Sequence, residues 1–175
     1  MLGSGARREF EAFAAASSTR LLRTAYLLCG DREHAEDLVQ MTLLRTARRW
    51  HAARAQPEAY TRRVLVNLAK DRWRDLGRRP AEVRLSGTVD FAAAFGEPEL
   101  RIDRDQLIAA LATLSDGQRA VVVLRYFDDL SVDDTAAALR CSAGTVKSQT
   151  SRALAALRSA LIRPTEPAKG TLDVH

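Results

Sequence analysis

The sequence predicts an all-α protein made of two small helical domains joined by a flexible linker. Alanine and arginine are abundant, and β-branched residues are sparse in the long periodic segments, so good helix formers dominate there. Apolar residues recur at spacings of three and four, which is the period of a helix with one buried face. Between residues 77 and 99 this period is lost and glycine and proline recur, as is typical of a connection between domains.

The first predicted domain, residues 1–76, begins with an apolar-periodic stretch at 9–29. This stretch predicts one or two helices, with Ser17 or Ser18 as a cap between them if there are two. Gly30 follows directly and is suited to end a helix in the left-handed conformation.

Two further helices are expected in this domain. Asp31 can cap a helix that runs to about Trp50, with its apolar residues on one stripe. The segment HAARAQP then breaks the pattern, and its Pro57 suits the first turn of a helix over about 58–76.

The second predicted domain, residues 100–163, has the layout of a helix-turn-helix. Helices are expected over 100–113 and 116–127, and Ser131 can cap a short helix with two aspartates in its first turn. The turn CSAG and the longer helix TVKSQTSRALAALRSAL follow, which completes the motif. The tail at 164–175 is expected to be disordered.

Charge is distributed unevenly along the chain. The net charge is +5. Residues 1–80 hold 16 Lys and Arg against 9 Asp and Glu, whereas residues 81–163 hold 10 against 11. A basic surplus confined to one half favours a polyanionic partner, although an arginine-rich solvated surface would give the same count.

Several classes of protein are not expected. Cys29 and Cys141 are far apart and form no C-x-x-C, so they predict small buried apolar residues. The three histidines have no ligand spacing with them, so neither a metal nor another cofactor is expected. No apolar run approaches the length of a membrane span and no secretory signal is recognisable, which predicts no membrane insertion and a cytoplasmic location.

Polar side chains at spacings of four, three and four line one face of the helix at 58–76. Such a stripe is either a solvated face or a ridge that follows a phosphate backbone, with its asparagine able to bond a base edge. The residues are Arg63, Asn67, Lys70 and Arg74.

The last helix has an outward face of a different kind. Its polar residues are suited to phosphates and base edges in a major groove, where a plain bundle would more often carry Glu and Lys pairs. A recognition helix is therefore favoured. The face consists of Thr145, Ser148, Gln149 and Arg152, flanked by Lys147 and Ser151.

Three stretches resemble an extracytoplasmic-function sigma factor of the sigma-70 family. GDREHAEDLVQMTLLRTARRW resembles the region-2 segment that holds the polymerase clamp, and PEAYTRRVLVNLAKDRWRD resembles the segment that reads the −10 element. LSDGQRAVVVLRYFDDLSVDDTAAALRCSAGTVKSQTSRALAALR resembles region 4, which reads the −35 element. Their order and separation, and the absence of an evident region 3, fit this compact subclass.

The resemblance implies a non-enzymatic subunit that binds RNA polymerase core enzyme and promoter DNA. Residues 1–76 would be region 2 and 100–163 region 4, with the stripe on the 58–76 helix at the −10 element and the face of the last helix at the −35 element. Because many relatives are held by an anti-sigma protein, such a protein is a further candidate partner. The core-binding surface would include Asp37, Leu38, Gln40 and Leu44.

Two positions depart from the family pattern. Arg140 stands in the turn where the family usually has glycine. A left-handed arginine costs about 1 kcal/mol, so the sequence leaves open how this turn closes. Met41 replaces a common acidic residue after Gln40, in the expected polymerase contact.

Two other classes of protein are alternatives to this interpretation. A conventional regulator would need a ligand pocket or a phosphoacceptor in its N-terminal half, where only basic helices are evident. A nucleic-acid-processing hydrolase would need clustered carboxylates or a His/Cys constellation. Glu33, Glu36 and Asp37 lie together without a partner cluster, as is usual at a solvated helix N-terminus.

Overall fold

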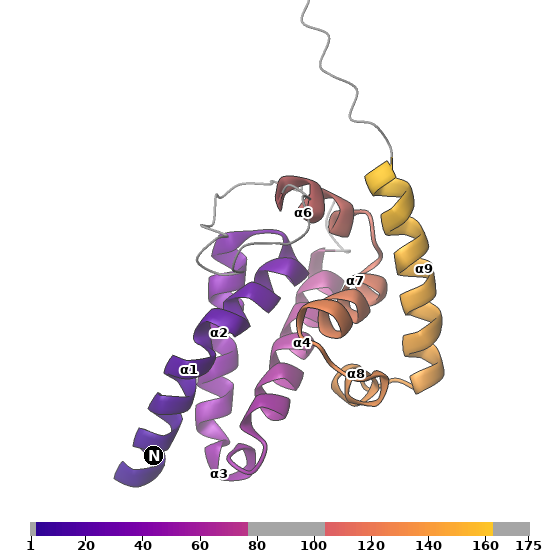
Figure 1. Cartoon of the computed structure of the whole chain (residues 1–175). Coiled ribbons are helices and arrows are strands. Elements are labelled where there is room, and N and C mark those ends of the chain that lie inside the picture. Colours follow the sequence, from indigo (N-terminus) through magenta and orange to yellow (C-terminus); the bar gives the residue numbers. More distant parts are fainter. Residues whose placement is uncertain (1–2, 77–103, 163–175) are drawn as a thin grey trace, which may run out of the picture.

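The computed structural model describes residues 3–76 and 104–162, and in these residues every regular element is a helix (Figure 1). The expected all-α class is therefore confirmed. The expected linker at 77–99 and tail at 164–175 lie outside the described residues. No helix in the described part combines the length and apolar character that crossing a bilayer requires.

The N-terminal bundle, as we call residues 3–76, is built on three long helices and one short one. Helices α1 and α2 pack on each other, and both pack against α4. The short α3 fills the corner before Pro57 opens α4. The bounds are Ser4–Cys29 for α1, Arg32–Arg48 for α2, Trp50–Ala53 for α3 and Pro57–Leu76 for α4.

Helix α1 is a single helix, so the two-helix alternative with a serine cap is wrong. The Ser17 hydroxyl donates to the Phe13 carbonyl at 2.7 Å, and the Ser18 hydroxyl donates to the Ala14 carbonyl. Both serines thus bond back to the preceding turn, an arrangement that a helix interior tolerates.

The corner between α1 and α2 closes as the sequence predicts. Gly30 is left-handed at φ 73°, and its N–H donates to the Tyr26 carbonyl at 2.7 Å. The Asp31 side chain accepts from the His34 N–H at 2.9 Å and so caps α2. Both ends are therefore satisfied locally, which explains why this corner could be inferred from sequence.

Threonines fill the seam between α2 and α4. Thr42, Thr46 and Thr61 are fully buried, whereas the apolar residues Leu43 and Ala47 beside them on α2 are half-buried. The Thr46 hydroxyl donates to the Thr42 carbonyl at 2.8 Å, and the Thr61 hydroxyl donates to the Pro57 carbonyl at 2.7 Å. The Thr46 and Thr61 hydroxyls are therefore satisfied within their own helices, which permits their burial at a close crossing. The buried Thr42 hydroxyl has no hydrogen-bond partner among the described residues.

The C-terminal bundle, as we call residues 104–162, contains four α-helices and a π-helical turn, η1. The bounds are Arg104–Ala112 for α6, Asp116–Val122 for α7, Val123–Phe127 for η1, Val132–Leu139 for α8 and Ala143–Ile162 for α9. Ser115 and Gln118 form a reciprocal capping box at the start of α7. The helix expected over 116–127 is therefore present, but its last five residues are π-helical.

The turn between α8 and α9 closes through Arg140 in the left-handed region, at φ 54° and ψ 50°. The N–H of Cys141 donates to the Ala136 carbonyl at 3.0 Å, as in a helix end that glycine usually forms. The family geometry is thus kept without glycine, and the chain bears the steric cost of a left-handed arginine.

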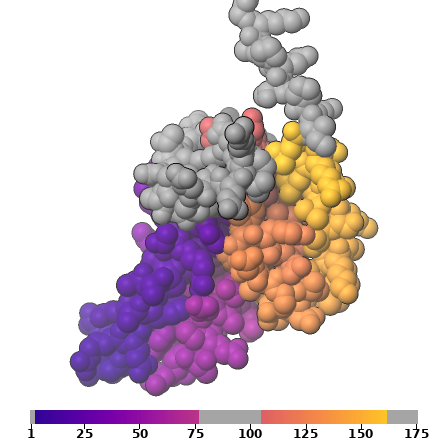
Figure 2. Space-filling view, in the orientation of Figure 1, coloured from indigo at the N-terminus to yellow at the C-terminus, as the bar shows by residue number. Residues whose placement is uncertain are grey.

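The two bundles share one apolar core. Buried leucines and valines of α1 and α4 join those of α6, α7, η1, α8 and α9 in a single cluster. Helix α4 lies against α8, and α1 lies against η1. In Figure 2 the magenta surface of α4 abuts the orange surface of residues 120–140. The sequence left the arrangement of the two domains undetermined, and the structure shows them closed on each other.

Cys29, at the C-terminal end of α1, and Cys141 are half-buried and pack against this core, so the prediction that both are buried apolar residues is only partly correct. Burial raises the pKa of the Cys29 thiol from 9.0 to about 12, and the charges of Arg72 and Arg119 oppose the rise. The folded state therefore favours the neutral thiol, and its contribution to stability is present below pH 9.0 and is lost as the pH rises toward 12.

We expect Cys29→Ala to remove this pH dependence. Between about pH 8.5 and about pH 10.5, the wild-type free energy of unfolding should fall by about 2 kcal/mol more than that of the variant. Urea unfolding of both proteins at the two pH values measures the difference. Equal pH dependence in the two proteins would contradict the buried-thiol account.

We expect Arg140→Gly to stabilise the chain by about 1 kcal/mol, because glycine adopts the left-handed conformation without steric cost. The urea-unfolding free energy measures this gain. Arg158→Gly is the matched control, since Arg158 is an exposed arginine inside α9, and glycine there should cost about 1 kcal/mol. A loss of stability in Arg140→Gly would show that the left-handed turn carries no strain.

Candidate nucleic-acid and polymerase interfaces

Helix α9 is held against the C-terminal bundle by its inner face. The Ser142 hydroxyl accepts from the Thr145 N–H at 3.0 Å and caps the first turn. Val146 and Ala153 are completely buried, against neighbours that include α7 and α8. Leu161, near the end of α9, is 40% exposed, so the last turn of α9 extends past the core.

The opposite face of α9 is open. Helix α9 forms an outer edge of the molecule, on the side away from α1 and α2 (Figure 1). The Thr145 hydroxyl lies 2.9 Å from that of Ser142, and the Ser148 hydroxyl donates to the Thr145 carbonyl. Gln149 is half-buried. The structure thus brings together on one accessible surface the exposed residues Thr145, Lys147, Ser148, Ser151 and Arg152.

The four residues of the α4 stripe differ in their exposure to solvent. Arg63 and Arg74 are exposed, and Asn67 and Lys70 are half-buried. Arg74 pairs with Asp71 at 3.0 Å along the same helix. Only Lys70 reaches the other bundle, where its ammonium donates to the Leu139 carbonyl at 2.8 Å.

The charged form of Lys70 is disfavoured in this position. Burial lowers the pKa of its ammonium, and the positive charges of Arg74 and Arg140 lower it further, against an opposing effect of Cys141. The carbonyl that it binds is at the C-terminal end of α8, where the helix dipole is negative. The Lys70 ammonium thus occupies the place of a C-terminal cap for α8.

The surface expected to bind polymerase lies on α2. Asp37, Gln40 and Leu44 are exposed, and Leu44 is 45% exposed. Leu38 is 7% exposed and belongs to the core, so the structure does not bring it to the same face. Met41, which was noted only as a departure, is 44% exposed and lies on that face by helical spacing.

A groove of about 540 Å³ separates the start of α4 from α8. Its walls carry both charge and apolar surface. They include Pro57, Arg62, Arg63, Leu130, Asp134 and Ala137.

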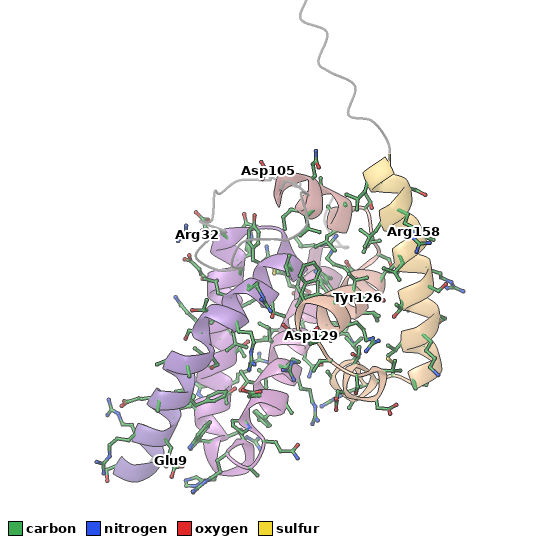
Figure 3. The ribbon with its side chains drawn as sticks, in the orientation of Figure 1. Glu9, Arg32, Asp105, Tyr126, Asp129 and Arg158 are labelled. Carbon is green, nitrogen blue, oxygen red and sulfur yellow. The ribbon has the colours of Figure 1, made fainter. Side chains whose placement is uncertain are left out.

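Sequence reasoning missed the polar contact at the centre of the interface. The Asp128 side chain is 4% exposed, and its carboxylate accepts from the Thr24 hydroxyl at 2.7 Å. The Arg62 Nε lies 3.5 Å from its other oxygen. Figure 3 labels the next residue, Asp129, between α4 and α8. Asp128 comes directly after the helix expected over 116–127, and no local signal in the sequence distinguishes it from a solvated aspartate.

The tryptophans and the acidic residues suggest no further site. Trp50 is 3% exposed, with its ring centroid 5.3 Å from that of Phe10 and 5.5 Å from that of Phe13. It is therefore a core residue. Within residues 3–76 and 104–162, no group of three or more His, Cys, Asp or Glu side chains is placed to hold a metal ion.

Two family models match this chain. The model described as sigma-70 region 2 matches residues 13–79, and the model described as sigma-70 region 4 matches residues 104–157. These matches cover the two helical bundles and leave the intervening segment between them.

Relatives match over most of the chain. An RNA polymerase sigma-E factor of Streptomyces avermitilis is 42% identical over 155 residues, which cover 87% of this chain and 85% of the relative. The sigma-E factor of Streptomyces coelicolor is 40% identical, over 88% of this chain and 86% of the relative. The solved structure of the sigma factor RpoE with the anti-sigma factor NepR from Bartonella quintana superposes with a TM-score of 0.70 at 27% identity, covering 88% of this chain and 97% of RpoE.

The architecture, the helix-turn-helix and these matches agree with one another along both bundles. The chain belongs to the sigma-70 family, among its extracytoplasmic-function sigma factors.

Proposed function

We propose that this chain binds RNA polymerase core enzyme and directs promoter-specific initiation, with α9 on the −35 duplex and α4 on the −10 element. The observation that carries the proposal is the accessible polar face of α9, which follows a short helix and a three-residue turn. The family supplies the polymerase as the partner.

The chemistry of α9 suits duplex reading. A helix of this kind enters the major groove with its N-terminal residues toward the bases. Arg152 offers a planar fork that matches the two acceptors of guanine, and Gln149 can pair with adenine. Lys147 and the hydroxyls of Ser148 and Ser151 are suited to phosphate oxygens, which fix the register on the duplex.

The chemistry of α4 suits an unpaired strand. Arg63, Lys70 and Arg74 form a row of cations at the spacing of one helix face, and Asn67 lies among them. Separating a base pair costs about 1.4 kcal/mol per step. Capture of the extruded bases and of the backbone that carries them offsets this cost.

The α2 face suits a protein partner. Leu44 and Met41 expose apolar surface beside Asp37 and Gln40. Two large apolar side chains with a polar rim resemble the centre of a protein interface. We propose that this face, without Leu38, contacts the polymerase clamp.

We propose three further properties of this chain. The chain acts by binding and performs no catalysis, it works in the cytoplasm with the transcription machinery, and an anti-sigma protein is a candidate regulator. The last statement is supported by the RpoE relative, which was solved with the anti-sigma factor NepR.

In vitro transcription tests the proposal directly. The purified chain and core polymerase are incubated with a genomic DNA library, and the start sites are mapped. The expected result is a set of start sites that share two elements at a fixed spacing. Absence of promoter-dependent transcripts, together with no association with core enzyme at any salt concentration, would overturn the proposal.

Arg152→Ala is expected to weaken −35 recognition by about 1–3 kcal/mol while leaving core binding unchanged, because Arg152 is an exposed residue of α9 distant from α2. Holoenzyme binding to a promoter duplex and core binding are measured in parallel. Arg158→Ala, on the later turns of α9, is the control and should behave as wild type. Loss of core binding in Arg152→Ala would contradict the assignment.

Leu44→Arg is expected to weaken core binding at least about tenfold, since it places a charge in an apolar contact. The free energy of unfolding should change by less than about 0.5 kcal/mol, because the side chain is already exposed. Leu161→Arg, at an equally exposed leucine on α9, is the matched control. Equal core affinity of the two variants would exclude the α2 face.

A further inference from the structure

Cations of the N-terminal bundle bind the C-terminal ends of two helices in the other bundle. The Arg23 guanidinium donates to the Phe127 carbonyl at the end of η1. The Lys70 ammonium donates to the Leu139 carbonyl at the end of α8. Such carbonyls lack partners within their own helices and lie at the negative end of the helix dipole. They therefore present partial negative charge to the other bundle.

Asp128 adds a full negative charge at the same surface. Its carboxylate faces three groups from α1 and α4: the Thr24 hydroxyl at 2.7 Å, the Arg62 Nε at 3.5 Å and the Arg23 guanidinium at 3.9 Å. The Asp128 side chain is 4% exposed and that of Arg62 is 14% exposed. A carboxylate this deeply buried is tolerated only with such partners, and losing one of them leaves a buried charge uncompensated.

The backbone conformation around Asp128 directs its side chain toward the N-terminal bundle. The π-helical turn η1 ends with the Asp128 N–H bonded to the Val123 carbonyl at 3.1 Å. The next residue, Asp129, is left-handed at φ 52° although it is not glycine. π-turns and left-handed non-glycine residues persist where the surroundings require them and are frequent at functional sites. Here they direct one aspartate into the other bundle and leave its neighbour exposed.

We infer that the C-terminal bundle imitates a nucleic-acid backbone in the closed chain. The Asp128 carboxylate and the Leu139 carbonyl engage Arg62 and Lys70 of α4, the helix proposed to hold the −10 strand. Lys70 belongs to the proposed −10 stripe, and Arg62 precedes Arg63 of that stripe. Closure and binding of the −10 strand therefore compete for the same positive charges. This inference rests on the proposed function.

The consequence for affinity is quantitative. When only a fraction of molecules is open, the apparent dissociation constant for the strand is the intrinsic one divided by that fraction. Weakening the interface raises the open fraction, so it should tighten strand binding without any new contact to DNA. A merely structural interface would not do this, because its loss would leave strand affinity unchanged or reduce it.

The test uses two substitutions that act from opposite bundles. Asp128→Asn keeps the shape of the side chain and removes the charge. Thr24→Val removes the hydroxyl donor on α1 and changes no charge that DNA could sense. Asp129→Asn is the matched control, since it removes a charge one residue away, at an exposed side chain, and asparagine accepts the left-handed conformation.

Two measurements are made on each full-length protein. Small-angle scattering gives the radius of gyration, and fluorescence anisotropy gives the affinity for a labelled oligo(dT) strand of about 15 nucleotides at one fixed salt concentration. Asp128→Asn and Thr24→Val should both enlarge the radius and bind the strand about tenfold more tightly, as expected when the open fraction rises tenfold. Asp129→Asn should match wild type in both measurements.

The possible failures are distinguishable. If both variants stay as small as wild type, or if they open without tighter strand binding, the inference is overturned, while wild-type promoter-dependent transcription would still support the proposed function. If wild type neither binds strand nor supports transcription with core enzyme, the proposed function fails. Circular dichroism of each variant separates opening from unfolding, since opening retains the helical signal.

Discussion

Hydrogen bonds from side chains of one bundle to helix-end carbonyls of the other hold the two bundles together. Arg23 and Lys70 supply donors to the ends of η1 and α8. Arg119 supplies one in the other direction, to the Leu28 carbonyl near the end of α1 at 3.2 Å, and within its own bundle it also donates to the Leu111 carbonyl of α6 at 2.9 Å. Burial lowers the pKa of the Arg119 guanidinium, with Asp116 opposing this effect. Each bundle thus completes hydrogen bonds that the other cannot make alone.

The shared core and this polar layer have different roles in closure. Apolar burial favours contact between the bundles but is not directional, so it would accept several relative orientations. The carbonyl contacts and the Asp128 cluster require particular atoms to meet, and they therefore fix the register of α4 on α8. The same layer adds less net stability than an apolar packing of equal size, because its ionic groups lose hydration on burial.

The parts of this structure that could be predicted are those that short stretches of sequence decide. Gly30, Asp31, Ser115 and Ser131 act on backbone groups within a few residues, so the helix ends and the helix-turn-helix followed from the sequence. The burial of Leu38, the threonine seam and the aim of Asp128 depend on segments that lie far apart along the chain. The spacing of apolar residues along a helix does not show which of its sides meets a second bundle. The residue types of a π-helical turn do not distinguish it from the α-helix before it.

The position of α9 on the outer edge has a consequence for how the chain finds promoters. Its polar face is accessible while α4 is engaged with the other bundle. On the proposed function, a closed molecule would contact intact duplex through the lysine, arginine and hydroxyl groups of α9, while Lys70 of α4 stays bonded to α8. Scanning of duplex and separation of strands would then belong to two different conformations of one protein.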